Sequence, residues 1–243
     1  MTSWRNWGGN VVASPVQVRH ATSADGVADA VRAAARAGLG VRVAGSGHSF
    51  TPLVATDGML LHVDGLSGVI GVDRERNRVR VLAGTPLHVL NPALQRLGLA
   101  LPNLGDVDRQ TISGAIATGT HGTGTRRQGI AAAVTGLTLV LADGSTLECS
   151  RDVQPDVFAA AAVGLGALGV VTEVTLRLLP NPPSVATILA FFDDDRTIAH
   201  AVAALASARL VPRCLELLDA IALDLVRRDA GLALPPGTKA MLL

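Results

Sequence analysis

The stretch that most constrains the fold is "VRVAGSGHSFTP", residues 41–52, in which a glycine-rich turn follows a run that alternates like a strand. Glycines leave backbone N–H groups open, so such turns commonly bind phosphate or another anion. In dinucleotide-binding Rossmann folds the turn leads directly into a helix. Here Phe50 occupies the third glycine position and Pro52 follows, so no helix is expected. The turn therefore argues against a Rossmann fold, and a phosphate site would not explain His48. A Walker A loop is also excluded, because no Gly-Lys-Ser/Thr occurs.

The segments around this turn predict a mixture of helices and strands. Residues 23–38 form an amphipathic pattern that begins at a Ser23 N-cap and ends at a glycine, which predicts a helix. Strands are expected at residues 40–45 and 59–65, and residues 69–84 alternate on both sides of a charged turn, which predicts a β-hairpin. The hairpin argues against a purely parallel sheet. The fold class predicted from this order is α+β.

A second loop is as rich in small residues as the first. Residues 99–124, "LALPNLGDVDRQTISGAIATGTHGTG", show little periodicity, and a long irregular tract inside a compact domain is usually functional. Thr118, Thr120 and Thr123 supply hydroxyl donors, and the glycines permit close approach of a ligand. Two such loops suit a long ligand that carries a diphosphate.

Composition excludes several classes of protein. With 49% hydrophobic residues in 243, the chain can bury one large core or two smaller ones. A net charge of +1 and 2% aromatic residues leave no basic stripe or stacking surface for nucleic acid. No secretion signal is recognised and the longest apolar run, residues 159–171, is too short for a membrane span, so we expect a cytoplasmic protein. In that setting Cys149 and Cys214 are expected to be reduced and buried.

Two other kinds of site are not expected. His20, His62, His88 and His200 occur singly along the chain, without further metal ligands at close spacing, so the sequence predicts no metal site. "AGSGH" lacks the G-x-S-x-G spacing of a serine-hydrolase nucleophile.

Four segments resemble one known family. They are "WRNWGGN" (4–10), "RVAGSGHSF" (42–50), "NLGDVDRQTISGAIATGTHGTG" (103–124) and "VGLGALGVVTEVTLRLLP" (163–180). In this order they are similar to the FAD-linked oxidases of the vanillyl-alcohol oxidase type, in particular the aldonolactone and alditol oxidases. The resemblance covers most of residues 4–180 and implies a two-subdomain FAD-binding fold of the PCMH type over residues 1–180.

The resemblance also implies a cofactor and its site. In such proteins the histidine of the motif G-x-x-H-S, here residues 45–49, is bonded to the flavin 8α-methyl group. His48 would therefore be a covalent tether for FAD. Gly105 matches a position where a small residue leaves room for dioxygen, and Asp106 stands where a serine is commoner. The implied cofactor-binding residues are Val43, Ala44, Gly45, Ser46, Gly47, His48, Ser49, Gly105, Asp106, Thr111, Gly114, Thr118, Gly119, Thr120, His121 and Val171.

Residues 181–243 look more like the beginning of the cap domain of glycolate oxidase subunits and D-lactate dehydrogenases. We therefore expect an incomplete α+β cap domain here, and we assign no catalytic acid or base. Three functions stay open: an oxidase or dehydrogenase of sugar lactones or alditols that uses dioxygen or another electron acceptor, a 2-hydroxy-acid dehydrogenase, and a flavin-binding fragment without turnover.

Overall fold

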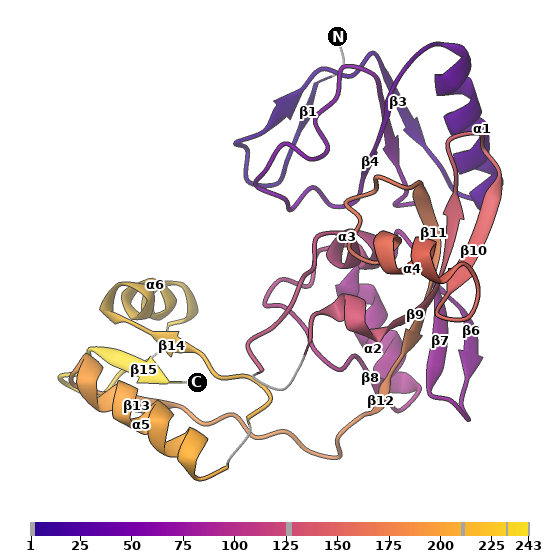
Figure 1. Cartoon of the computed structure of the whole chain (residues 1–243). Helices are drawn as coiled ribbons and strands as arrows, with labels where there is room; N and C mark the ends of the chain where they lie inside the picture. The colour runs from indigo at the N-terminus through magenta and orange to yellow at the C-terminus, as the bar shows by residue number, and fades with distance from the viewer. Residues whose placement is uncertain (1–2, 125–127, 210–211, 232, 243) are drawn as a thin grey trace. The chain divides into compact units, whose positions relative to one another are not determined.

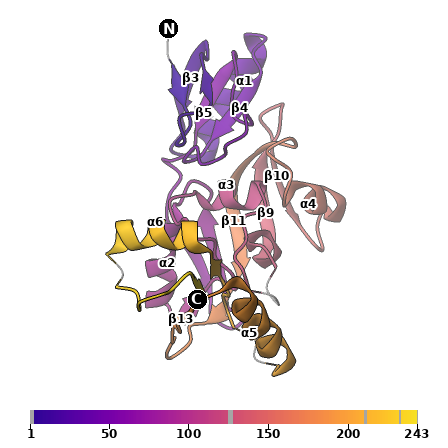
Figure 2. The same ribbon diagram turned by 90° about the vertical axis from the view of Figure 1, so that its left-hand side faces the viewer.

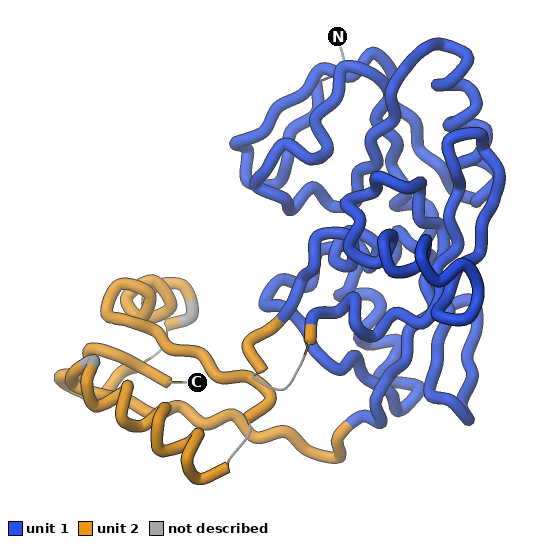
Figure 3. Tube along the Cα trace, viewed as in Figure 1, with its two compact units in different colours: residues 1–121, 129–181 blue, residues 122–128, 182–243 orange. Residues whose placement is uncertain are grey.

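A computed structural model of the chain describes residues 3–124, 128–209, 212–231 and 233–242. The chain forms two compact units, one of residues 1–121 and 129–181 and one of residues 122–128 and 182–243 (Figure 3). The sequence placed a boundary after residue 180, whereas the compact units divide after Asn181, and residues 122–128 group with the second unit. Helices and strands are mixed in both units, which confirms the α+β class. Among the described helices, none has the length and apolar character that crossing a membrane requires.

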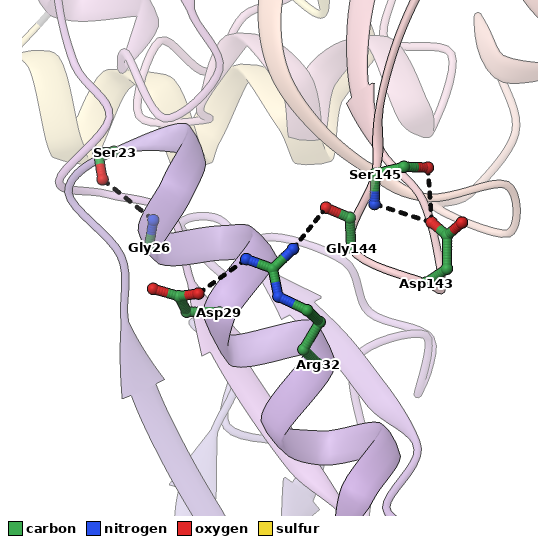
Figure 4. A network of polar contacts seen from close by, with 7 residues as sticks. All are labelled: Ser23, Gly26, Asp29, Arg32, Asp143, Gly144 and Ser145. Atoms are coloured by element: carbon green, nitrogen blue, oxygen red, sulfur yellow. Dashed lines mark hydrogen bonds and ion pairs between the residues drawn. The ribbon is translucent and has the colours of Figure 1, made fainter.

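A three-stranded parallel sheet forms one part of the first unit. Its strands β3 (Gln17–His20), β4 (Val41–Ala44) and β5 (Met59–His62) are arranged in the order β3-β5-β4. Helix α1 (Ala24–Arg36) connects β3 to β4, and Val27 and Val31 on its inner face are buried in one cluster with Leu61 of β5. Its predicted N-cap is confirmed, because the Ser23 hydroxyl accepts a hydrogen bond from the Gly26 N–H (Figure 4).

A five-stranded antiparallel sheet forms the rest of the first unit's core. Its strands follow the order β10-β9-β11-β7-β6 (Figure 1). They are β6 (Val69–Asp73), β7 (Arg78–Leu82), β9 (Val134–Val140), β10 (Thr146–Ser150) and β11 (Val170–Arg177). The predicted hairpin around residues 74–77 is β6 with β7, and a second hairpin joins β9 to β10.

Short helices pack against this sheet. They are α2 (Leu87–Arg96), α3 (Ile112–Ala117), α4 (Pro155–Ala161) and the 3-10 helix η1 (Ile130–Ala133). Residues 99–124 were expected to be irregular, and the presence of α3 corrects that expectation. Ile112 and Ile116, one turn apart, are buried, but the small residues between them make the helical period hard to recognise. Two-stranded ladders pair β1 (Trp4–Arg5) with β2 (Val12–Ala13) and β8 (Leu99–Ala100) with β12 (Leu179–Pro180).

The second unit is a small α+β body. Its strands β13 (Ala190–Phe192), β14 (Leu217–Leu218) and β15 (Ala240–Leu242) form an antiparallel sheet in the order β13-β15-β14. Helices α5 (Asp195–Ser207) and α6 (Ala220–Ala230) contact this sheet. Ile198 of α5 packs with Ala240 and Leu242 of β15.

The cysteines lie in different units, and no disulfide joins them in the described chain. Cys149 is buried in the core cluster of the five-stranded sheet, as expected. Cys214 is exposed, which corrects the expectation of two buried thiols.

Candidate functional site

A cavity of about 480 Å³ lies within the first unit. Its lining comes from α1, from β4 and the glycine-rich turn that follows β4, and from α3, β9, β11 and the turn before β11. Both views show α3 close to the end of β4 (Figures 1 and 2). The two loops that the sequence singled out therefore meet at one cavity.

The turn after β4 exposes backbone donors to this cavity. Gly47 has a φ of +70°, a conformation that favours glycine, and the described residues 51–58 contain no helix, as the sequence predicted. Within the described part of the chain, the backbone N–H groups of Ser46 to Ser49 donate no hydrogen bond. They are available to an anion or to water.

The N-terminal segment holds this turn in place. The buried side chain of Asn6 donates hydrogen bonds to the Ser49 carbonyl (2.9 Å) and to Asn10 Oδ1 (2.7 Å), and its Oδ1 accepts one from the Val11 N–H (3.0 Å). The Trp7 N–H donates to the Gly47 carbonyl at 2.9 Å. Neither Asn6 nor Trp7 was predicted as a site residue. The motif "WRNWGGN" was their only signal, because backbone carbonyls so far away along the chain leave no trace in local patterns.

His48 lines the cavity beside an aromatic side chain. Its ring centroid lies 5.1 Å from that of Trp7, at an interplanar angle of 33°. Partial burial lowers the pKa of His48, because a charged imidazolium would lose solvation there. The neutral imidazole is therefore the favoured form near pH 7.

The second loop meets the first at Thr111. A Cβ atom on Gly45 would overlap Thr111 Oγ1, so only glycine fits at this position without a shift. Thr111 is the N-cap of α3, and the Ile112 N–H donates to the Thr85 carbonyl at 2.8 Å, which fixes the start of the helix. Gly114 and Thr118 also line the cavity, and the Thr118 hydroxyl donates to the Gly114 carbonyl at 2.9 Å.

The structure brings most of the sequence-predicted site residues to the cavity, but not all. Those that line it are Val43, Gly45, Ser46, Gly47, His48, Ser49, Thr111, Gly114, Thr118 and Val171. Those outside its lining are Ala44, Gly105, Asp106, Gly119, Thr120 and His121. Ala44 is buried within β4. Gly105 lies against Thr120 and the His121 carbonyl, so these three residues form a group of their own outside the cavity lining.

Of the cavity lining contributed by β9, by β11 and by the turn before β11, only Val171 was predicted from the sequence. In the structure residues 164–169 of this turn also line the cavity, as do Val170, Val174, Leu137 and residues 139–142. The glycine-rich segment "VGLGALG" was the only sequence signal for this part of the cavity. The sequence of an apolar core does not show which of its residues border a cavity.

Comparison with known families shows which kind of domain contains this cavity. The family described as "FAD binding domain" matches residues 15–150, which is more than half of the chain. The chain belongs to this FAD binding domain family. Residues 181–243 match a second family, described as "FAD linked oxidases, C-terminal domain".

Individual relatives agree with this assignment. The chain is 45% identical over 177 residues to L-gulono-1,4-lactone dehydrogenase of Mycobacterium tuberculosis, covering 73% of this chain and 41% of the relative. It is 41% identical over 178 residues to L-gulonolactone oxidase of Mus musculus, covering 73% and 40%. An alkyldihydroxyacetonephosphate synthase structure shares the fold, with a TM-score of 0.77, 16% identity and coverage of 93% of this chain and 47% of that one. The chain thus spans about two fifths of the length of these curated relatives.

The residues of the FAD binding domain fit the cofactor. FAD is long and carries a diphosphate, and the cavity combines open backbone N–H groups at Ser46 to Ser49 with an apolar wall at Leu139 and Val171. At Gly45 the missing side chain keeps the backbone close to Thr111, as a narrow phosphate-binding cradle requires. The FAD site predicted from the sequence therefore has a suitable cavity in the structure.

Proposed function

We propose that this chain belongs to an FAD-dependent oxidoreductase that oxidises a hydroxyl-bearing carbon of a sugar lactone, an alditol or a similar polyol. One structural observation supports this most directly: the turn with His48 and the loop with Thr111 line the same cavity in an FAD binding domain. The named activities of the lactone-oxidising relatives supply the substrate class. When bound, FAD would supply the hydride acceptor and then return the electrons to dioxygen or another acceptor.

The protein's own residues would bind and orient the cofactor. The N–H groups of Ser46 to Ser49 would bind the diphosphate, and the hydroxyls of Thr111 and Thr118 would add polar groups to the lining of the same cavity. The apolar wall around Val171 suits the adenine end. Asn6 acts indirectly, because its three hydrogen bonds hold the turn in one conformation.

We further propose that His48 is the covalent attachment point of the flavin. A histidine nitrogen can form such a bond only while its lone pair is free, and partial burial lowers the pKa of His48 in the direction that keeps it neutral. The Trp7 ring packs beside the imidazole, with 5.1 Å between the ring centroids, and would limit the rotation of the imidazole.

The group around Gly105 is proposed to face the reacting end of the cofactor. This assignment to Gly105, Asp106, Gly119, Thr120 and His121 comes from the family resemblance, since these residues lie outside the cavity lining. A Cβ atom at Gly105 would lie 3.0 Å from Thr120 Cγ2 and 3.2 Å from the His121 carbonyl, so glycine lets these segments pack closely. That a small residue here leaves room for dioxygen is what the family resemblance implies. The proposal includes no catalytic acid or base among the described residues.

The test is anaerobic reduction of the purified flavoprotein by candidate substrates. L-Gulono-1,4-lactone and an alditol such as xylitol are expected to bleach the flavin absorbance, and air or a dye to restore it. Persistent yellow colour with every polyol and lactone would contradict the proposal.

A second candidate is an FAD-dependent 2-hydroxy-acid dehydrogenase. It is favoured by residues 181–243, which match the family described as "FAD linked oxidases, C-terminal domain" and resemble in sequence the cap of glycolate oxidase subunits and D-lactate dehydrogenases. Bleaching by D-lactate or glycolate and not by lactones would establish it. Flavin that no donor reduces would instead indicate a binding fragment without turnover.

A further inference from the structure

Two histidines that are far apart along the chain lie side by side in the parallel sheet. His20 ends β3 and His62 ends β5, and the register of the two strands pairs them directly. Because paired residues of neighbouring strands point to the same face, their rings are stacked, with centroids 4.5 Å apart and an interplanar angle of 6°. The sequence predicted no metal site because these histidines occur singly along the chain. The strand pairing brings two of them together, so that argument no longer applies.

A carboxylate completes the group. Asp64 follows His62 by two residues, and its Oδ1 lies 3.5 Å from His20 Nδ1. One ligand atom from each of the three residues lies within 4.8 Å of the other two. A tetrahedral zinc ion with bonds of about 2.1 Å separates its ligand atoms by about 3.4 Å, so small side-chain rotations would bring all three onto one ion.

We propose that His20, His62 and Asp64 form a binding site for a divalent transition-metal ion of the zinc class. Two imidazole nitrogens and one carboxylate oxygen are ligands that Zn²⁺, Ni²⁺ and Cu²⁺ accept, whereas Mg²⁺ and Ca²⁺ require oxygen ligands. The side chains of His20 and Asp64 are 61% and 64% exposed, so an ion can enter and water can fill the fourth position.

The site would stabilise the edge of the parallel sheet. β3 is an outer strand of the β3-β5-β4 sheet, and an ion held by His20 on β3 and His62 on β5 cross-links the outer strand to the central one. An ion that binds only the folded chain raises its stability in proportion to the logarithm of its concentration. None of the three residues lines the cavity proposed for FAD, so the two proposals are independent.

The competing explanation needs no metal. The exposed His20 and Asp64 would form a weak surface ion pair, and the two histidine rings would simply stack. Metal binding distinguishes the two, because an ion pair with stacked rings produces no saturable, stoichiometric uptake of Zn²⁺.

The experiment uses the whole chain without an affinity tag, treated with EDTA, with the exposed Cys214 replaced (Cys214→Ser) to remove a competing thiol. Calorimetric titration with ZnCl₂ is expected to give one site per chain. A saturating concentration of ZnCl₂, but not of MgCl₂, is expected to raise Tm by about 2–4 °C, and EDTA to reverse the rise.

Variants assign the binding to these residues. His20→Ala and Asp64→Ala, at exposed positions, are expected to weaken Zn²⁺ binding at least tenfold while the metal-free Tm stays nearly the same. The control His200→Ala removes an exposed histidine of the second unit and is expected to bind as the parent does. His62→Ala is informative only together with these variants, because His62 is half-buried. Absence of saturable binding, or equal affinity in the parent and His20→Ala, would overturn the proposal.

Discussion

The guanidinium of Arg32 donates a hydrogen bond of 3.0 Å to the backbone carbonyl of Gly144, which joins α1 to the turn between β9 and β10 (Figure 4). Asp29 orients the same guanidinium at 2.8 Å, one turn earlier on the helix. On the other side, Asp143 accepts hydrogen bonds from the N–H and hydroxyl of Ser145, which shape the turn. Because α1 and the end of β9 both line the cavity, this contact connects two of its walls.

Arg32→Ala is expected to lower the free energy of unfolding by about 1 kcal/mol, the usual value of one such hydrogen bond. The loss should appear as a lower midpoint in urea denaturation and as faster release of any non-covalently bound flavin. Arg36→Ala, on an exposed position of the same helix, is the matched control. Equal midpoints for the two variants would show that the contact contributes nothing measurable.

Gly45→Ala is expected to reduce flavin content strongly, because its Cβ would overlap Thr111 Oγ1. Overpacking of this kind costs about 1–3 kcal/mol of stability. Gly40→Ala is the matched control, since Gly40 also lines the cavity but a Cβ there meets no atom within 4 Å. In a Thr111→Ala background the additional cost of Gly45→Ala should shrink, and a double-mutant cycle on Tm measures the difference. Strict additivity would contradict the proposed steric cause.

Asn6→Ala is expected to destabilise the chain by about 2 kcal/mol, because the Ser49 carbonyl and the Val11 N–H lose a buried partner. If the turn then loses its fixed conformation, hydrogen exchange around residues 46–50 should accelerate and the fraction of covalent flavin should fall. Asn91→Ala on α2, away from the cavity, controls for the loss of an asparagine. Unchanged exchange in the turn of Asn6→Ala would contradict the role of this side chain.

The helix α5 of the second unit is expected to depend on pH. Asp194 is its N-cap, and hydrogen bonds from Thr197 to its carboxylate lower the pKa of Asp194 below the ordinary 3.8. A carboxyl whose pKa is lower in the folded state stabilises that state above its ordinary pKa, and the contribution disappears as the pH falls through the lower value. Helicity measured by circular dichroism from pH 7 to pH 2 should show this loss. Asp194→Asn, which keeps a capping oxygen, should flatten that part of the profile; an unchanged profile would contradict the assignment.

Much of the fold was predictable from local patterns. Capping and periodicity located α1, and the charged turn at residues 74–77 located the β6–β7 hairpin, because in both places neighbouring residues determine the local structure. The apolar run "VATILAFF" (residues 185–192) favours a strand along its whole length, but its first part forms none in the structure. Val185 and Ile188 are exposed, and only Ala190–Phe192 pair with β15, because a strand needs a partner that its own sequence does not specify.

The candidate site was predictable where a motif carried it. The turn with His48 and the loop with Thr111 were found from their glycines and from the family resemblance. Asn6 was missed because its partner in the glycine-rich turn, the Ser49 carbonyl, is far away along the sequence and only the folded chain brings it near. The pairing of His20 with His62 was missed for a related reason, since strand register depends on contacts between distant segments.

The most direct test of the central claim is an absorbance spectrum of the purified protein, measured again on pellet and supernatant after acid precipitation. We expect flavin absorbance that stays in the pellet, and that moves to the supernatant in His48→Ala but not in the control His88→Ala. Flavin found wholly in the supernatant of the parent would contradict the covalent link at His48, and a colourless protein that takes up no FAD would contradict the binding site itself.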